Sequence, residues 1–188
     1  MLDHLEIDSP NRKDGVHYGP TNETYFRRML RVVPMPPETY AFVDLGCGKG
    51  RALLLAAEYE FARVIGVDFS PELLEFAREN IARFRARTGS TRTFELHVCD
   101  ATTFDLPLEP LALYLYNPFG ESVLRRVLER LHASLQEVPR DIVVLYLRPF
   151  HRQVFNDSAY LLPVKMTSQY CVYRSLSHVS GRTDVVDR

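Results

Sequence analysis

The stretch VDLGCGKGR, residues 43–51, places three glycines within five positions directly after a short apolar run. Glycine loses more conformational entropy on folding than any other residue, so this loop needs a backbone without side chains. Either a tight structural turn or the close approach of a ligand would create that need. The rest of the sequence has to decide between these two interpretations.

The composition is that of a single globular domain. The chain has 188 residues, of which 46% are hydrophobic and 25% are charged, and its formal net charge is −1. This balance predicts a sizeable core and no sequence-wide attraction to nucleic acid or to an anionic membrane. The three cysteines, Cys47, Cys99 and Cys171, are odd in number and far apart, which favours a reducing compartment over a disulfide framework.

No targeting or membrane segment is visible in the sequence. The first residues lack a basic region followed by an apolar stretch, and the apolar runs are too short to span a bilayer. We therefore expect a soluble, cytoplasmic protein with no membrane partner. The sequence leaves the oligomeric state open.

The chain divides into residues 1–20, a polar N-terminal arm, and one domain over residues 21–188. A helix is predicted from Thr21 or Asn22 up to the PMPP segment, residues 34–37, because proline cannot continue a helix. A later helix is predicted to begin at Pro71 with Ser70 as its N-cap, and Leu73, Ala77, Ile81 and Phe84 are its expected apolar stripe.

From residue 41 onward, apolar segments with the character of buried strands alternate with helical segments. This order is typical of an α/β fold, a doubly wound and mostly parallel sheet of about seven strands with helices on both faces. Pro163 places one of the last strands near an edge of the sheet. The predicted strands are 41–45, 63–69, 93–100, 111–117, 141–147, 160–166 and 169–176, and the predicted helices between them are 49–59, one from 71, and 121–135.

Polar residues stand where four consecutive strands end. The glycine loop follows the first strand, and Asp68, Asp100 and Asn117 end the next three. Ligands bind at the carboxyl ends of the strands in sheets of this class, so these residues are expected to form one site.

The glycine spacing separates the nucleotide-binding motifs. Gly46, Gly48 and Gly50 give Asp-x-Gly-x-Gly-x-Gly, which is tighter than the dinucleotide motif Gly-x-Gly-x-x-Gly and lacks the Gly-Lys-Ser/Thr ending of a P-loop. Asp44 lies two residues before Gly46. A carboxylate at that position suits a ligand with a cationic group better than a pyrophosphate.

Four segments in order, FVDLGCGKGRALLLAA, VIGVDFSPELLEFAREN, HVCDATTFDLP and LYLYNPFG, resemble successive motifs of the class I S-adenosylmethionine-dependent methyltransferases. The resemblance runs from residue 42 to residue 119 and implies a Rossmann-like fold with S-adenosylmethionine as cofactor and S-adenosylhomocysteine as product. It implies that Gly46, Gly48 and Gly50 approach the methionine half and the ribose. Asp44 would face the amino group of the cofactor, and Asp68 would accept hydrogen bonds from the ribose hydroxyls.

The same resemblance implies an adenine site. Phe69 would pack against the adenine, and Asp100, helped by the backbone of Ala101, would accept from its amino group. Two alternatives stay open. Asp68 could complement the positive end of the following helix, and Asp100 could be an ordinary polar strand end.

The segment NPFG, Asn117 to Gly120, resembles the Asn/Asp-Pro-Pro-aromatic motif of nitrogen methyltransferases but lacks the second proline. By this resemblance Asn117, Pro118 and Phe119 are the candidate catalytic residues, and Asn117 also counts among the cofactor-binding residues. The alternative is a plain turn between a strand and a helix.

The cofactor carries an activated methyl group, so the protein mainly has to align donor and acceptor. No general base is obvious, and no spacing of Cys and His predicts a metal site. The expected acceptor is a nitrogen on a protein side chain or a small molecule, and nucleic acid is not expected. The alternatives are a non-catalytic S-adenosylmethionine-binding subunit and a nicotinamide-dependent oxidoreductase, which the glycine spacing disfavours.

Overall fold

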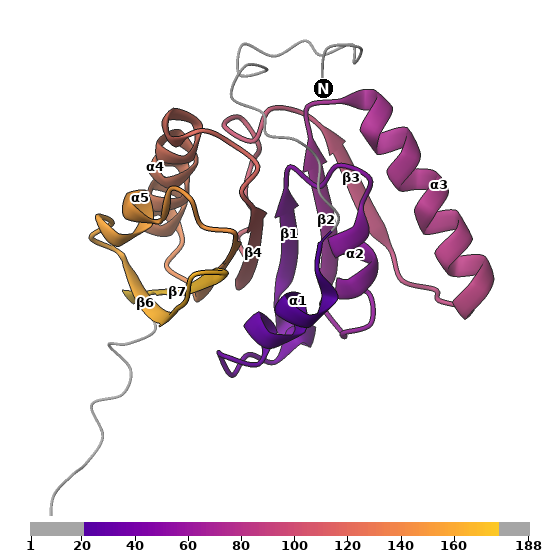
Figure 1. Cartoon of the computed structure of the whole chain (residues 1–188), viewed down its shortest axis with the longest axis horizontal. Helices are drawn as coiled ribbons and strands as arrows, with labels where there is room; N and C mark the ends of the chain where they lie inside the picture. The colour runs from indigo at the N-terminus through magenta and orange to yellow at the C-terminus, as the bar shows by residue number, and fades with distance from the viewer. Residues whose placement is uncertain (1–20, 177–188) are drawn as a thin grey trace, which may run out of the picture.

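The computed structural model describes residues 21–176, which form a seven-stranded sheet of order β3-β2-β1-β4-β5-β7-β6 (Figure 1). Neighbouring strands from β3 across to β5 are parallel, and β7 is antiparallel to both β5 and β6. The predicted α/β class is confirmed. The predicted arm lies outside the described residues. The strands are β1 Ala41–Leu45, β2 Arg63–Asp68, β3 Phe94–Val98, β4 Leu111–Tyr116, β5 Ile142–Leu147, β6 Leu161–Met166 and β7 Tyr170–Ser175.

Helices cover both faces of the sheet, as predicted. The helices α1 Glu23–Leu30, α2 Arg51–Ala56 and α3 Pro71–Thr88 pack on one face, and α4 Glu121–Glu137 and α5 Arg152–Asn156 pack on the other (Figure 1). A short 3₁₀ turn, Pro37–Thr39, precedes β1. The central strands β1, β4 and β5 are buried along their whole length or nearly so, which explains their continuous apolar sequences.

Local chemistry sets the ends of the helices. Asn22 caps α1 by accepting from the Tyr25 amide, and Ser70 caps α3 by accepting from the Leu73 amide, with Pro71 in the first helical position. The predicted stripe of α3 is corrected at one position, because Leu74 is buried there and Leu73 is only partly so. The helix α2 begins later than predicted because Gly50, at φ +78°, ends the preceding turn.

The antiparallel end of the sheet matches the prediction that Pro163 lies near an edge. Its strand, β6, is the last in the sheet and is exposed along most of its length. The helix α5 was not predicted, because five residues are too few to show a helical period. No helix among residues 21–176 has both the length and the apolar character needed to cross a bilayer.

A largely buried polar cluster joins the amino ends of β1 and β5 to the carboxyl end of β7. Asp141, just before β5, accepts two hydrogen bonds from the Arg174 guanidinium on β7, with N–O distances of 2.8 and 2.6 Å. The hydroxyl of Tyr40, just before β1, also donates to Asp141. Bidentate pairing of this kind holds two groups in one relative orientation, so the cluster keeps β1, β5 and β7 in register.

The loop after β1 packs directly on the turn after β4. Gly46 has φ +78°, and a Cβ built on it would lie 2.6 Å from the Pro118 Cβ and 3.6 Å from the Phe119 ring. Gly50 faces α3, where a Cβ would lie 3.2 Å from the Ala77 Cβ. All three loop glycines have a positive φ, Gly48 at +52°, and Gly46 and Gly50 in addition pack closely against other residues.

We expect Gly46→Ala to lower the free energy of unfolding by about 2–5 kcal/mol, because left-handed backbone strain and overpacking against Pro118 add. Gly89→Ala is the matched control. Gly89 has φ +68° with no atom within 4 Å of a Cβ, so only backbone strain, about 1–2 kcal/mol, applies. Urea denaturation measures both variants. Equal losses would contradict the close packing of the loop on the turn.

Candidate functional site

The sequence-predicted site residues meet at one edge of the sheet. Asp68 ends β2, the glycine loop and Asn117 directly follow β1 and β4, and Asp100 lies two residues after β3. The carboxyl ends of these four strands point the same way (Figure 1). Between β1 and β4 the strand order reverses, because β2 lies on one side of β1 and β4 on the other. Such a switch point is where doubly wound sheets leave a crevice for a ligand.

Asp68 holds the glycine loop against β2. Its Oδ2 accepts from the Gly48 amide at 2.8 Å, and its Oδ1 accepts from the Ser70 amide at 2.9 Å. The carbonyl of Val67 accepts from the Gly46 and Cys47 amides at 2.8 and 3.0 Å. The carboxylate is 6% exposed, and burial raises its pKa even though the two backbone hydrogen bonds lower it.

Asp44 is a second buried acid beside the first. It is 3% exposed, and no group among the described residues donates a hydrogen bond to its carboxylate. Burial, followed by repulsion from Asp68, raises the pKa of Asp44 well above its usual value. Burial and the same two carboxylates also raise the pKa of the Cys47 thiol. The surroundings of the loop therefore disfavour further negative charge and are suited to a cationic group.

The turn after β4 is strained and oriented by β5. Asn117 is 6% exposed with φ +40°, in the left-handed region that asparagine tolerates better than most residues. The Tyr146 hydroxyl donates to the Asn117 Oδ1 at 3.3 Å. Burial raises the pKa of Tyr146 to about 12, so the hydroxyl stays protonated and can donate.

The two residues that follow Asn117 differ in exposure. Pro118 is partly exposed at the edge of the sheet. Phe119 packs into the hydrophobic core with 4% of its surface exposed, so its ring supports the turn from below. A contact between Phe119 and an acceptor stays a prediction.

The predicted adenine side is partly open. Phe69 is partly exposed, and Ala101 is buried. The Asp100 Oδ1 accepts from the Thr102 amide and hydroxyl at 2.8 and 2.7 Å, which makes it a turn-forming residue as well as a candidate ligand. Both interpretations of Asp100 given by the sequence remain open.

Three further residues at this edge were not predicted from the sequence. Tyr114 pairs in register with Asp44, and its hydroxyl lies 3.2 Å from the Thr21 Oγ1. Tyr146 orients Asn117, and Arg148 directly follows β5. Only Arg148 had a signal in the sequence that could have identified it as a site residue. It is a charged residue at the end of an apolar strand, and Asp68 has the same position at the end of β2.

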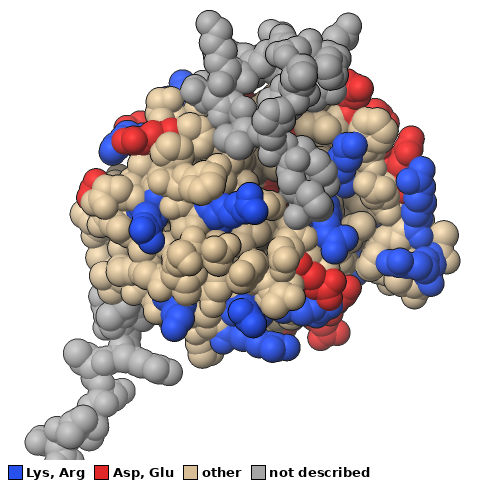
Figure 2. All heavy atoms as spheres, viewed as in Figure 1, with Lys and Arg blue, Asp and Glu red and all other residues tan. Residues whose placement is uncertain are grey.

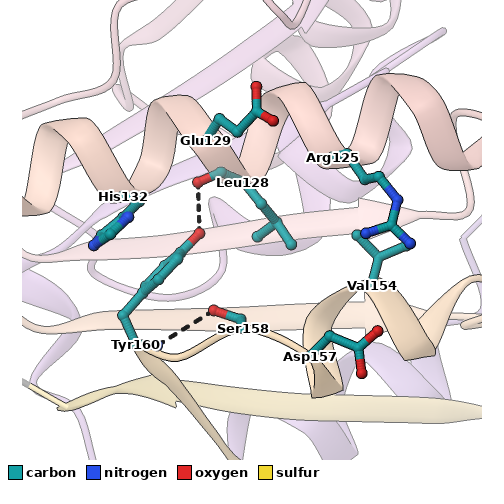
Figure 3. A pocket seen from close by; sticks show the side chains of 8 residues that line it. All are labelled: Arg125, Leu128, Glu129, His132, Val154, Asp157, Ser158 and Tyr160. Carbon is teal, nitrogen blue, oxygen red and sulfur yellow. Dashed lines mark hydrogen bonds between the residues drawn. The ribbon is translucent and has the colours of Figure 1, made fainter.

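The described residues include no group of three or more metal-ligating side chains close enough to hold a metal ion. A separate hollow of about 210 Å³ lies between α4 and the segment that leads from α5 into β6, and none of the predicted site residues lines it (Figure 3). There the His132 and Tyr160 rings stack at 4.5 Å, and the Tyr160 hydroxyl donates to the Leu128 carbonyl at 2.5 Å.

Known proteins resemble the chain in its sequence and fold. A family model described as a methyltransferase domain matches residues 38–143. A protein-lysine N-methyltransferase of Saccharolobus islandicus is 33% identical over 92 residues, 46% of this chain and 56% of that protein. A trans-aconitate 2-methyltransferase of Methylobacterium radiotolerans is 45% identical over 67 residues, 35% of this chain and 25% of that protein. The chain thus spans little more than half, or less, of these curated relatives.

The fold is shared with solved structures. An RNA methyltransferase of Salinibacter ruber, solved with S-adenosylhomocysteine, superposes with a TM-score of 0.57 at 24% identity, covering 84% of this chain and 92% of that chain. The family match extends over more than half of this chain and includes the glycine loop, Asp68, Asp100 and Asn117. The chain therefore belongs to the class I S-adenosylmethionine-dependent methyltransferases.

Proposed function

We propose that the protein transfers a methyl group from S-adenosylmethionine to a nitrogen atom of a protein side chain or a small molecule. The buried pair of acids, Asp44 and Asp68, supports the donor half of this proposal, which is the binding of the methyl donor. Asp44 and Asp68 lie together at the switch point, and Asp44 has no hydrogen-bond donor among the described residues. A buried carboxylate without a partner is costly, and a cationic ligand removes that cost.

In this proposal each side chain has one task toward the cofactor. The Asp44 carboxylate accepts from the amino group, and the free lone pairs of Asp68 accept from the ribose hydroxyls. Gly46, Gly48 and Gly50 form the wall beside the methionine half and the ribose. Phe69 packs on the adenine, and Asp100 with the Ala101 amide contacts its polar edge.

The acceptor half of the proposal, which is the binding of the methyl acceptor, rests on the turn after β4. The Asn117 side-chain oxygen and the Pro118 carbonyl accept hydrogens of the acceptor nitrogen and direct its lone pair toward the methyl group. Tyr146 holds the Asn117 amide in position through its hydroxyl. Phe119 keeps the turn in place from the core.

The bound cofactor supplies an electrophilic methyl group on a sulfonium, and the protein supplies alignment and exclusion of water. Positioning alone accounts for large accelerations when the reacting atoms are held near contact. The proposal uses no general base from the protein. The acceptor nitrogen must therefore bind in its neutral form, with a free lone pair. The segments that could shape an acceptor pocket are the N-terminal arm and the helix after it, the connection 101–110 and the loop around residues 148–156.

The relatives support different acceptors. The archaeal protein is named for lysine nitrogen, and the Methylobacterium protein for trans-aconitate, a small molecule. The RNA methyltransferase of Salinibacter ruber has the same fold, so our expectation that nucleic acid is not the acceptor has no support from these likenesses. On the face that Figure 2 shows, Lys and Arg are interspersed with Asp and Glu and do not gather into one basic platform.

The donor half predicts opposite effects of Asp44→Asn on stability and on binding. The raised pKa means that the folded state holds this proton more tightly than the unfolded state, so ionisation of Asp44 destabilises the free protein as pH rises through that pKa. At neutral pH and above, we expect the variant to have a higher melting temperature than the wild type. The increase should be about 2–4 °C for each kcal/mol gained by removing the buried charge and its repulsion from Asp68. S-Adenosylmethionine affinity should fall at least tenfold.

Calorimetric titration and thermal melts of the free protein measure both effects. Wild-type affinity should also weaken as pH falls through the raised pKa of Asp44, at a pH well above the usual aspartate range, and the variant should lose this dependence. Binding of NAD in place of S-adenosylmethionine would overturn the donor half. So would a variant that binds the cofactor as wild type does.

The acceptor half predicts a selective loss of turnover in Asn117→Gly. Glycine adopts φ +40° without strain, so this change removes the amide and leaves the backbone in place. Turnover should fall by about a hundredfold or more, because misplacement of the acceptor by about 1 Å costs that much. Cofactor affinity should change little, because the amide lies on the acceptor side of the turn.

Tyr146→Phe is the companion variant, since it removes only the hydroxyl that orients Asn117. It should lower turnover less than Asn117→Gly and leave cofactor affinity unchanged. Transfer of tritiated methyl groups into protein and small-molecule fractions of a cell extract measures turnover and separates the acceptor classes. Binding without any transfer would instead indicate a non-catalytic S-adenosylmethionine-binding subunit.

A further inference from the structure

Arg148 lies beside Asn117 at the carboxyl edge of the sheet. Tyr116 and Leu147 are register partners on β4 and β5, and the next residue of each strand is Asn117 and Arg148. Among the described residues other than glycine, only these two have a positive φ, +40° at Asn117 and +49° at Arg148. Strained backbone of this kind persists where the surrounding structure enforces it, and it concentrates at ligand sites.

Several contacts hold the Arg148 backbone in this conformation. Its amide donates to the Gln169 carbonyl at 2.8 Å, which joins it to the connection between β6 and β7. Its carbonyl accepts from the Phe150 amide, also at 2.8 Å. These two hydrogen bonds fix the backbone of the turn on both sides of the Arg148 side chain.

No carboxylate of the described residues pairs with the guanidinium of Arg148. It lies 6.0 Å from the centre of the Tyr116 ring, is exposed, and forms no ion pair with a carboxylate of residues 21–176. Other arginines do form such pairs, with acids on their own or neighbouring elements. Phe150, two residues on, leaves 71% of its surface exposed at the same turn.

The directions of the side chains place the Arg148 guanidinium on the same face of the sheet as Asp44. Tyr114 pairs in register with Asp44, and Tyr116 lies two residues further along β4, so all three point to the same face of the sheet. The guanidinium over the Tyr116 ring extends this row onto β5. The edge is therefore acidic at β1 and β2 and cationic at β5, and Asn117 lies between the two charges.

We propose that Arg148 binds an anionic group of the methyl acceptor, a carboxylate or a phosphate, while Asn117 holds the atom that is methylated. This inference rests on the proposed function. Arginine stays protonated in proteins and cannot serve as a base, so its task toward a ligand is to donate hydrogen bonds to an anion. Its forked donors suit both carboxylate and phosphate. Phe150 adds an apolar surface beside the bound anion.

The test uses the full chain saturated with S-adenosylhomocysteine and two small anions as probes, succinate and inorganic phosphate. Sodium chloride at equal ionic strength is the reference. The amide NMR signals of Tyr116, Asn117 and Phe150 should shift saturably with at least one probe. The probe that saturates at the lower concentration identifies the class of anion.

Arg148→Gln should abolish the shifts, and Arg148→Lys should retain them at about tenfold higher probe concentration, because charge remains but the fork is lost. Arg152→Gln is the matched control. Arg152 is exposed at the start of α5 and forms no ion pair with a described carboxylate, so its removal should leave the shifts unchanged. Melting curves check that each variant is folded.

Three results would overturn the inference. One is the absence of saturable shifts in the wild type, and another is an equal loss in Arg152→Gln, which indicates unspecific ionic effects. The third is a loss of S-adenosylhomocysteine affinity in Arg148→Gln, which would assign the arginine to the cofactor's own carboxylate. S-Adenosylhomocysteine binding to the wild type is measured first, before any anion is added. If it does not bind, the proposed function itself fails.

Discussion

The carboxylate of Asp68 is the contact on which the rest of the site depends. It accepts one backbone hydrogen bond from the glycine loop and one from the turn into α3, so it joins two connections that are 20 residues apart in the sequence. Once the loop is held there, Gly46 packs on Pro118, and the turn after β4 is brought against the loop. In the proposed function, the side that binds the methyl donor and the side that binds the acceptor thus share this contact.

The same carboxylate creates an electrostatic cost. Asp44 and Asp68 are both buried near each other, and each has a pKa raised first by burial. A fold selected for stability alone would place apolar residues there, because buried charge without a partner opposes folding. In the function proposed above, a cationic ligand at Asp44 would offset this cost, so the free protein would be less stable than the bound one.

Tyrosines on the central strands organise the site from beneath. Tyr114 lies under the donor side next to Asp44, and Tyr146 fixes the amide of Asn117. Burial raises the pKa of both hydroxyls, so each remains a neutral hydrogen-bond partner at physiological pH. The polar groups at this edge are thus held by the sheet itself, and the exposed loops need only add the contacts that select an acceptor.

The sequence by itself determined the class of fold and which polar residues meet at the carboxyl edge of the sheet. Alternation of apolar strands and helices is a local pattern, and parallel strands bring their carboxyl ends to one edge, so Asp44, Asp68, Asp100 and Asn117 were identifiable together. Only the tertiary structure decided that Gly46 is required by Pro118, that Tyr146 orients Asn117 and that Arg148 lies beside it. These contacts join residues about 30 or more positions apart, and sheet register and packing, which no local pattern encodes, set their distances.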